Sequence, residues 1–552
     1  MRLEPSAQKL RGGYYTPDTI VKFITDWSIQ SPKIRVIEPS CGDGVFLEHA
    51  IKKLLDLGAV SVVDLVQAIE INPEEAEKAR KRLRNLFQES MDKIILTGDF
   101  FEFCQSSLMK ENLFDVVVGN PPFIRYQNFP PKQREIALNL MRNIGLKPNR
   151  LTNTWLPFLV GSTLMLKEHG RLGMVVPAEL MQVNYASELR QFLSTYYKNI
   201  VLVTFKRLVF EGIQQEVILF LGERDGINTN GIRVVELDDI NDLEVFEHEK
   251  IYQREVKPMD HTKEKWIQYF LEKDEIQLLR KLRQDERLVK GRDVLDVDVG
   301  VVTGQNSYFI LTEKKSKELD IRSYTTPIVA RSGHLKGIVF KEKDWQKNLQ
   351  DALPSLLLNI PPKPVEKLTK SLQKYIEFGE KEGINKGYKC RIRNFWYNVP
   401  SIWSPDGFML RQIYDYPKIV ANRFNATSTD TIHRVRMLNN FNIETVAVAF
   451  LNSLTLAFSE VIGRSYGGGV LELYPSEIAD LPFPIKGASE LSIKYIDEIL
   501  KKEGIEAILE NTDRILLRER LGLSLKQVKI LRNIWCKLRD RRIQRKKPPF
   551  KI

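Results

Sequence analysis

The segment best suited to chemistry is Asn120-Pro121-Pro122-Phe123. Its two prolines carry no backbone N–H, so the segment presents carbonyl acceptors without competing donors. The Asn120 side-chain oxygen and the Pro121 carbonyl can both accept hydrogen bonds from one exocyclic amino group, which pulls the amine out of conjugation and aims its lone pair. Phe123 offers a flat face on which a planar base can stack. The segment therefore predicts a site that activates the amino group of a base, and the plainer alternative is a proline turn after a buried strand.

A second set of residues is suited to a nucleotide-like ligand. Gly42 and Gly44 stand in the segment Glu38-Pro39-Ser40-Cys41-Gly42-Asp43-Gly44, where they allow a ligand to approach the backbone at the start of a helix. Glu70 can accept from the hydroxyls of a ribose. Asp99 can accept from an adenine amino group, with Phe100 beside it as a ring wall. Each acid alone is more often a solvated strand end, but the three together with the glycine turn indicate a nucleotide site.

These residues follow a regular alternation of apolar runs and helical stretches. Such alternation predicts an α/β, doubly wound parallel sheet with helices on both faces. Ligands bind such sheets beyond the carboxyl ends of the strands. The glycine turn, the acids and the proline segment all follow a predicted strand directly. The predicted strands are Ile34–Pro39, Asp64–Ile71, Ile94–Asp99, Phe114–Gly119, Arg171–Val176, Ile200–Phe205 and Glu216–Leu221.

The Asn-Pro-Pro-Phe quartet and the Glu-Pro-x-x-Gly-x-Gly turn together resemble the amino-group DNA methyltransferases. The order of segments is informative as well, because Gly12-Gly13-Tyr14-Tyr15-Thr16-Pro17 precedes the glycine turn and a basic region follows the catalytic half. This order resembles the gamma class (TaqI-like) of N6-adenine DNA methyltransferases of restriction–modification systems. The resemblance spans about residues 10–225 and continues more weakly beyond them.

The resemblance implies three parts. Residues 1–240 would form a class I (Rossmann-like) methyltransferase domain, residues 241–490 an α+β DNA target-recognition domain, and residues 491–552 a helical, basic C-terminal segment. The implied cofactor is S-adenosyl-L-methionine, and the implied substrate is the N6 amino group of a flipped-out adenine in double-stranded DNA. We further expect a monomer in the cytoplasm of a bacterium or archaeon, with a cognate restriction endonuclease acting separately on the same site.

The resemblance also assigns residues. The methionine part of the cofactor would meet Thr16, and the ribose and adenine would meet Glu70 and Asp99. Phe210 would stack on the flipped base opposite Phe123, although an isolated Phe before a strand is as often a core residue. The implied cofactor-binding residues are Thr16, Glu38, Pro39, Gly42, Gly44, Glu70, Asp99 and Phe100, and the implied catalytic residues are Asn120, Pro121, Pro122 and Phe123.

The charge of the chain is unevenly placed. The 552 residues carry a net charge of +12, whereas residues 1–240 hold 29 Lys and Arg against 29 Asp and Glu. The excess therefore lies after residue 240, as expected for a part that meets a polyanion. The alternative is solvated charge over an ordinary core. The tail Arg532–Lys551 is interpreted as an additional phosphate-binding arm or as a disordered basic end. The predicted DNA-binding residues are Lys389, Arg391, Arg393, Trp396 and Arg434.

Several classes are disfavoured by the sequence. No run of apolar residues is long enough to cross a membrane, and the first residues lack the apolar core of a signal peptide. The four cysteines and six histidines are scattered, so we expect neither disulfides nor a protein-bound metal. Three alternatives stay open: an RNA adenine methyltransferase, a protein glutamine methyltransferase, and a catalytically inactive nucleic-acid-binding protein. The sequence does not indicate which DNA site is recognised.

Overall fold

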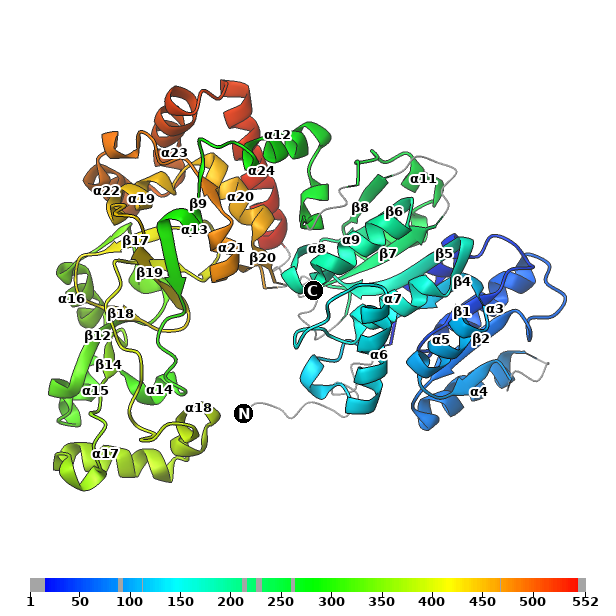
Figure 1. Cartoon of the computed structure of the whole chain (residues 1–552), viewed down its shortest axis with the longest axis horizontal. Helices are drawn as coiled ribbons and strands as arrows, with labels where there is room; N and C mark the ends of the chain where they lie inside the picture. Colours follow the sequence, from blue (N-terminus) through cyan, green and yellow to red (C-terminus); the bar gives the residue numbers. More distant parts are fainter. Residues whose placement is uncertain are drawn as a thin grey trace, which may run out of the picture. The chain divides into compact units, whose positions relative to one another are not determined.

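The computed structural model describes residues 15–87, 93–111, 113–210, 216–224, 231–259, 264–466 and 468–544. The chain divides into two compact units (Figure 1). One consists of Met1–Lys273, Tyr466–Gly468 and Gln544–Ile552, and the other of Asp274–Ser465 and Gly469–Ile543. Of the segments singled out in the sequence, Gly12–Tyr14, Gly467 and residues 545–551 lie outside the described residues.

The first unit is built on an eight-stranded sheet in the order β3-β2-β1-β4-β5-β7-β6-β8. Each of the seven predicted runs overlaps one strand, and β8 is an addition to them. The α/β class is confirmed, but the sheet is not wholly parallel, because β7 runs antiparallel to both β5 and β6. The connection between Phe205 and Val217 is too short for a crossover helix, so β7 can only return antiparallel. The strands are β1 (Val36–Glu38), β2 (Val66–Glu70), β3 (Ile95–Thr97), β4 (Phe114–Gly119), β5 (Leu166–Pro177), β6 (Asn199–Phe205), β7 (Val217–Glu223) and β8 (Gly231–Leu237).

Helices cover both faces of this sheet (Figure 1). On one face α2 (Asp18–Ser28), α3 (Val45–Asp56) and α4 (Pro73–Leu86) pack together, and on the other α5 (Phe100–Met109), α6 (Pro131–Asn143) and α7 (Trp155–Leu164) do so. Val116 and Val118 of β4 belong to the same core as Trp27 and Phe46 under the first group. Side chains alternate along a strand, so Val117 faces the second group.

Helix α4 shows why the predicted helices form where they do. Pro73 stands in its first turn, and the Asn72 side chain accepts hydrogen bonds from the backbone N–H groups of Glu74 and Glu75. A proline at this position loses no hydrogen bond, because the N–H that it lacks would have no partner within the helix. An Asn cap accepts hydrogen bonds from other N–H groups of the first turn that also lack a partner within the helix. The acidic side chains in this turn also lie at the positive end of the helix dipole. The helix therefore begins at Pro73, and it ends at Leu86.

The first unit continues past residue 240 because the following segment packs on the sheet. Trp266 stacks on Phe220 of β7, with ring centroids 6.5 Å apart and an interplanar angle of 8°. The Tyr252 hydroxyl donates to Glu223 at 3.0 Å. The remaining helices of this unit are η1 (Tyr126–Asn128), α8 (Glu179–Gln182), η2 (Asn184–Ala186), α9 (Ser187–Tyr196), α10 (Asp242–Val245), α11 (Glu249–Tyr252) and η3 (Trp266–Phe270).

The second unit combines small, mostly antiparallel sheets with separate helices. Its largest sheet has five strands in the order β10-β19-β15-β17-β13, and a second has four in the order β11-β14-β12-β18. The strands of these two sheets are β10 (Leu295–Asp298), β19 (Ile432–Met437), β15 (Gly407–Leu410), β17 (Ile419–Asn422), β13 (Val339–Phe340), β11 (Ile310–Leu311), β14 (Leu356–Leu358), β12 (Thr325–Val329) and β18 (Thr427–Ser428). Shorter strands are β9 (Val289–Lys290), β16 (Gln412–Ile413), β20 (Arg464–Ser465), β21 (Leu471–Glu472) and β22 (Pro482–Phe483).

Most helices of the second unit lie between these strands or follow them. Those among the strands are α12 (Lys273–Arg283), α13 (Gly291–Val294), α14 (Asn306–Phe309), α15 (Glu313–Glu318), α16 (Glu342–Gln350), α17 (Lys370–Lys381), α18 (Tyr388–Arg391), α19 (Ile443–Ala449), α20 (Ser453–Ile462) and α21 (Pro475–Ala479). Those at the C-terminal end are α22 (Ile493–Glu503), α23 (Glu506–Thr512), the π-helix η9 (Asp513–Arg520) and α24 (Leu525–Gln544). Among the described residues no single helix is long and apolar enough to cross a membrane. Helices α19 and α20 reach the necessary length and apolar composition only when they are counted together, and the pair is bent by 82°.

The described part of the basic C-terminal segment is mostly helical, and up to Ile543 it belongs to the second unit. Arg542 is 2% exposed and pairs with Glu460 at 2.7 Å. It also donates to the carbonyls of Tyr414 and Gly469. A guanidinium held by buried partners is not available to a phosphate, so the expected phosphate-binding role does not hold for Arg542.

A substitution at Gly44 tests the packing of α3 on α4. The φ of Gly44 is +85°, and a methyl group there would lie 2.9 Å from the Ala79 Cβ. We expect Gly44→Ala to lower the free energy of unfolding by about 2–4 kcal/mol, because left-handed strain and overpacking add. Gly58→Ala is the matched control: its φ is +97°, and none of the described atoms lies within 4 Å of the added methyl. Denaturant titration that gave equal losses for both variants would contradict this packing.

Candidate active site

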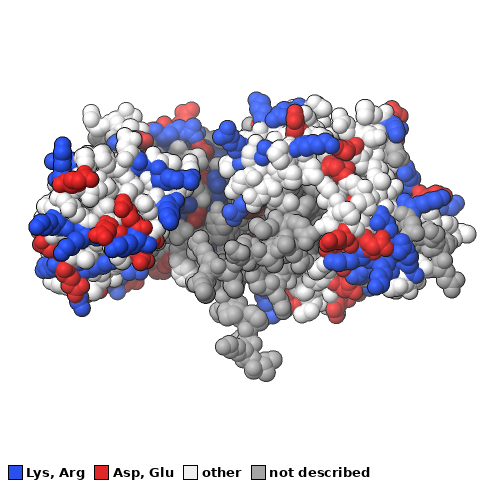
Figure 2. Space-filling model, turned by 90° about the horizontal axis from the view of Figure 1, so that it is seen from below, with Lys and Arg blue, Asp and Glu red and all other residues white. Residues whose placement is uncertain are grey.

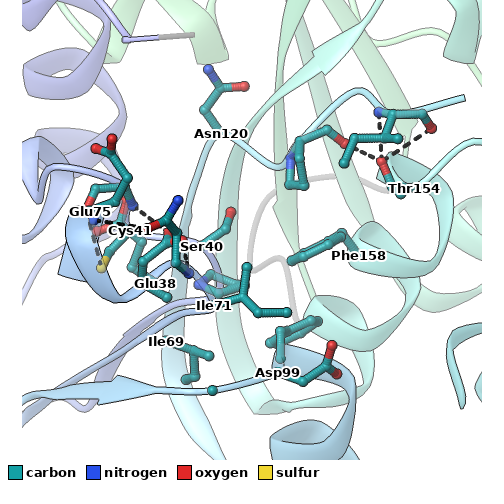
Figure 3. A pocket seen from close by; sticks show the side chains of 18 of the residues that line it. Glu38, Ser40, Cys41, Ile69, Ile71, Glu75, Asp99, Asn120, Thr154 and Phe158 are labelled. Carbon is teal, nitrogen blue, oxygen red and sulfur yellow. Dashed lines mark hydrogen bonds between the residues drawn. The ribbon is translucent and has the colours of Figure 1, made fainter. Parts of the chain in front are cut away.

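A cavity of about 840 Å³ opens at the carboxyl ends of strands β1 to β4 (Figure 3). Acids and small residues from four separate loops meet there, although they are far apart in the sequence. Nine of the thirteen residues assigned from the sequence to the methyltransferase site line this cavity. They are Thr16, Glu38, Pro39, Gly42, Glu70, Asp99, Phe100, Asn120 and Pro122.

Glu70 closes the end of β2 against the glycine turn after β1. One carboxylate oxygen accepts from the Gly42 backbone N–H at 2.9 Å, and the other accepts from the Asn72 N–H at 2.8 Å. Burial raises the pKa of Glu70, although these two backbone hydrogen bonds act in the opposite direction. Each carboxylate oxygen can accept a second hydrogen bond. Glu70 therefore fixes the glycine turn and keeps acceptor capacity toward the cavity.

Asp99 has a role that the sequence did not reveal. It caps α5, since its Oδ1 accepts from the backbone N–H groups of Phe101 at 2.8 Å and Glu102 at 3.1 Å. Burial raises the pKa of Asp99. Phe100 follows and stacks on Phe158 of α7, with ring centroids 4.9 Å apart and an interplanar angle of 11°. The cap fixes Asp99 next to this aromatic pair, and Figure 3 shows Asp99 far from Asn120 in the cavity.

Glu38 is the most unusual group in the cavity. Its side chain is 2% exposed, and its Oε2 has no hydrogen-bond partner among the described residues. Burial, with Asp43 and Glu70 adding negative charge nearby, raises its pKa well above the ordinary value. None of the described residues that line the cavity is Lys, Arg or His. A buried carboxylate without a cation is costly, so the cavity is suited to a ligand that brings positive charge or strong donors.

The loop after β4 is held from two sides. The Asn120 side-chain Nδ2 donates to the Thr16 hydroxyl at 3.1 Å. On the other side the Thr154 hydroxyl donates to the Pro122 carbonyl and accepts from the Ile124 backbone N–H at 2.8 Å (Figure 3). Sequence reasoning missed Thr154. A Thr before the apolar run that begins at Trp155 is a helix-start signal, but nothing local indicates that it reaches the proline loop.

The remaining assigned residues of the first unit do not line the cavity. Gly44 begins α3 and packs on Ala79. Pro121 is buried in the loop between two lining residues. Phe210 is 8% exposed in a hydrophobic core, and Phe123 is half-buried against the same core. Whether these two rings stack on a base stays a prediction.

The predicted DNA-binding residues fall into two groups. Lys389 and Arg391 are exposed. Arg393 donates to the carbonyls of Val302 and Thr303, both at 2.9 Å. The Trp396 ring N–H donates to Glu380 at 3.1 Å. These last two residues are therefore already engaged by their own unit.

Arg434 belongs with the engaged residues. It is 3% exposed, pairs with Asp298 at 3.0 Å and donates to the carbonyls of Val299 and Ser401. Its guanidinium also lies over the Trp403 ring, 4.3 Å from the centroid. Basic residues in a sequence do not distinguish such buttresses from exposed contacts.

Two exposed apolar residues lie next to the exposed Lys389 and Arg391 in the sequence. Tyr388 and Ile392 are 65% and 59% exposed, and they flank Lys389 and Arg391 along the chain. On the face drawn in Figure 2, Lys and Arg side chains lie among Asp and Glu side chains and are not gathered into one patch. Segment 388–392 is therefore distinguished by its mixture of cations and exposed apolar side chains, not by charge density alone.

Metal and thiol chemistry find little support in the described residues. No group of three or more His, Cys, Asp or Glu side chains among them could hold a metal ion. Cys41 lines the cavity, but burial, together with Glu38 and Glu70, raises the pKa of its thiol well above the ordinary value. A thiol that resists ionisation is a poor nucleophile.

Two family models match the chain. Residues 46–210 match the Eco57I restriction-modification methylase, and residues 263–517 match the C-terminal domain of the Type II methyltransferase M.Eco57I. The Type II methyltransferase M.AccI of Acinetobacter calcoaceticus is 22% identical over 91% of this chain and 92% of its own length. The Type II methyltransferase M.HindII of Haemophilus influenzae is 24% identical over 60% of each chain.

A solved structure is similar in fold. The DNA complex of the Type IIL restriction-modification enzyme MmeI aligns with a TM-score of 0.54 and 12% identity, covering 100% of this chain and 80% of that one. At this identity the likeness concerns the fold alone.

Glu38 yields a prediction about stability and pH. Its pKa in the folded protein lies above its unfolded value, so the folded state binds more protons and stability falls as pH rises from about 4.3 through the folded pKa. Glu38→Gln removes this titration. We expect the free energy of unfolding of wild type to fall relative to the variant as pH rises, with the gap closing near pH ~4.

Chemical denaturation of the ligand-free protein across this pH range measures the effect. The matched control is Glu168→Gln, at an exposed position on β5, which leaves Glu38 in place and should keep the wild-type slope. Parallel pH profiles for wild type and Glu38→Gln would show that the pKa of Glu38 is not raised in the folded protein.

Proposed function

Because the chain belongs to the Type II DNA methyltransferases of restriction–modification systems, we propose that it transfers a methyl group from S-adenosyl-L-methionine to the N6 amino group of adenine in duplex DNA. The observation that carries the proposal is the Asn120–Phe123 loop, which lies at the mouth of an acidic cavity with the Asn120 amide held by Thr16. We place the enzyme in the bacterial cytoplasm with its DNA, acting as a monomer beside a separate restriction endonuclease.

The cavity residues fit this cofactor. When bound, S-adenosylmethionine supplies a methyl group that is activated by a positively charged sulfur. The unpartnered Oε2 of Glu38 suits the positive charge and the ammonium donors of such a molecule. Glu70 retains acceptor capacity for ribose hydroxyls, and the second oxygen of Asp99 can accept from an adenine amine beside Phe100. The absence of basic side chains from the described lining further favours a cationic ligand.

The proline loop supplies the acceptors for the amine that is methylated. With its Nδ2 donated to Thr16, the Asn120 amide can turn its oxygen to one N–H of the amine. The Pro122 carbonyl is occupied by Thr154, and no described residue donates to the Pro121 carbonyl, which can take the second N–H. Both acceptors stabilise the positive charge that develops on nitrogen during transfer. No titrating base is needed at this step, because the proton can leave to water afterwards.

Reaching the amine requires the adenine to leave the duplex. Extrusion costs a few kcal/mol, and stacking on an aromatic ring returns about 1–3 kcal/mol per base. Phe123, two residues after Pro121, is the first candidate for this stacking, with Phe210 as the second. Phe210 belongs to the hydrophobic core of the first unit, and Phe123 packs against that core.

A methyl-transfer assay tests the proposal. Purified protein would be incubated with labelled S-adenosylmethionine in three separate reactions, which contain duplex DNA, structured RNA or a protein extract. We expect label in the duplex, and sequencing of modified bases should find N6-methyladenine at one recurring sequence. Label confined to RNA or protein, or located on cytosine, would contradict the proposed substrate.

Asn120→Ala should lower the rate of methyl transfer by about 10²–10³-fold, because one preorganised acceptor is lost at a developing charge. Cofactor affinity, measured by calorimetry, should change little, since the amide is assigned to the amine. Asn139→Ala is the matched control: Asn139 is exposed on α6, away from the proline loop in sequence. Near-normal turnover of Asn120→Ala would exclude this mechanism.

DNA binding by the second unit is proposed to rest on the exposed residues of segment 388–392. Lys389→Ala and Arg391→Ala should each weaken binding to duplex DNA and reduce the slope of log affinity against log salt by about 0.9, as expected for one lost phosphate contact. Arg434→Ala should instead lower Tm by several degrees, because it leaves Asp298 and two carbonyls without their donor.

Fluorescence anisotropy in a salt series, together with thermal melting, separates the two effects. If Arg434→Ala kept the wild-type Tm while Lys389→Ala and Arg391→Ala kept wild-type affinity, the division into buttressing and contacting residues would be wrong.

A further inference from the structure

The Asn120–Phe123 loop raises a problem of support. Most loops are held partly through their backbone N–H groups, but Pro121 and Pro122 have none. These two prolines can therefore take part in backbone hydrogen bonding only through their carbonyl groups, which requires a donor from elsewhere in the fold. The Thr154 hydroxyl is that donor, since it donates to the Pro122 carbonyl.

Thr154 also contacts Ile124, the residue that directly follows this loop. Its hydroxyl oxygen accepts from the Ile124 N–H at 2.8 Å, and its own backbone N–H donates to the Ile124 carbonyl at 3.0 Å. The residue is 1% exposed and lines the cavity, as Asn120 and Pro122 also do. The backbone on the far side of the two prolines is thereby fixed relative to α7.

The hydroxyl serves the loop at the expense of its own helix. Thr154 is the N-cap residue of α7, a position where a Thr hydroxyl ordinarily accepts from the backbone N–H groups of the first turn. No such cap hydrogen bond is present at α7. In the same unit Asn72 and Asp99 do cap α4 and α5, so the uncapped start of α7 reflects where the Thr154 hydroxyl is used.

We propose that Thr154 is a positioning residue for methyl transfer. By occupying the Pro122 carbonyl and holding Ile124, it sets the turn so that the Asn120 amide oxygen and the Pro121 carbonyl converge on one amino nitrogen. Thr16 restrains the Asn120 side chain from the opposite side. This inference rests on the proposed function, and it adds the residue that determines which proline carbonyl is left for the substrate.

Three variants test it. Thr154→Val keeps the shape and removes the hydroxyl, and Thr154→Ser keeps the hydroxyl. Thr152→Val removes a hydroxyl that is equally buried, at 2% exposure, and that accepts from the Asn149 N–H instead of contacting the loop. The readout is single-turnover methylation of bacterial genomic duplex DNA with labelled S-adenosylmethionine. In such an experiment the rate constant measures how fast methyl transfer occurs, whereas the amplitude measures how much of the enzyme is correctly folded.

We expect Thr154→Val to lower the rate constant by about 10²-fold, as a misplacement of the order of 1 Å does, with cofactor affinity within about twofold of wild type. Thr154→Ser and Thr152→Val should stay within a few-fold of wild type. A normal rate constant in Thr154→Val, whether its amplitude is full or reduced, would overturn the positioning role. Equal impairment of Thr154→Ser would do the same. A wild-type protein that methylates no nucleic acid would overturn the proposed function, and this assignment with it.

Discussion

The absence of backbone donors at Pro121 and Pro122 is the constraint on which the rest of the site depends. It leaves carbonyl oxygens exposed to an amine, and it also means that the loop cannot hold itself in place. The fold meets this need with two threonines: Thr16 before α2 restrains the Asn120 side chain, and Thr154 at the start of α7 restrains the backbone. Helices on opposite faces of the sheet therefore bear on a single loop at the end of β4.

The second constraint is electrostatic. Glu38 is buried with an oxygen that lacks a partner among the described residues, and the described lining supplies acids and no cations. In the ligand-free protein this arrangement opposes folding, because burial disfavours the charged carboxylate. A ligand with positive charge would reverse the sign of that contribution. The stability that the ligand-free protein loses by burying Glu38 is therefore regained when such a ligand binds, and it strengthens the binding. Such a trade of stability for function is common at functional sites.

Sequence patterns predicted those parts of the molecule that depend on local order. Apolar runs located the seven strands, and strand ends located Glu38, Glu70 and Asp99, because a doubly wound sheet brings such ends together. The patterns did not predict the antiparallel β7, the cap formed by Asp99, or the bond from Thr154 to Pro122. These features depend on connection length, on a choice between two uses of one carboxylate, and on contact between residues far apart in the chain. None of these leaves a periodic signal.

The arginines of the second unit show the same limit and suggest how to read its charge. Arg434 and Arg542 are fixed by Asp298 and Glu460, whereas Lys389 and Arg391 are exposed. Each of these two ion pairs joins one acid and one base, so it leaves the net charge unchanged. The basic excess after residue 240 must therefore rest on side chains outside these pairs, and those are the ones able to release counterions from a polyanion. Net charge thus indicates that a polyanion is bound, while burial decides which residues can bind it.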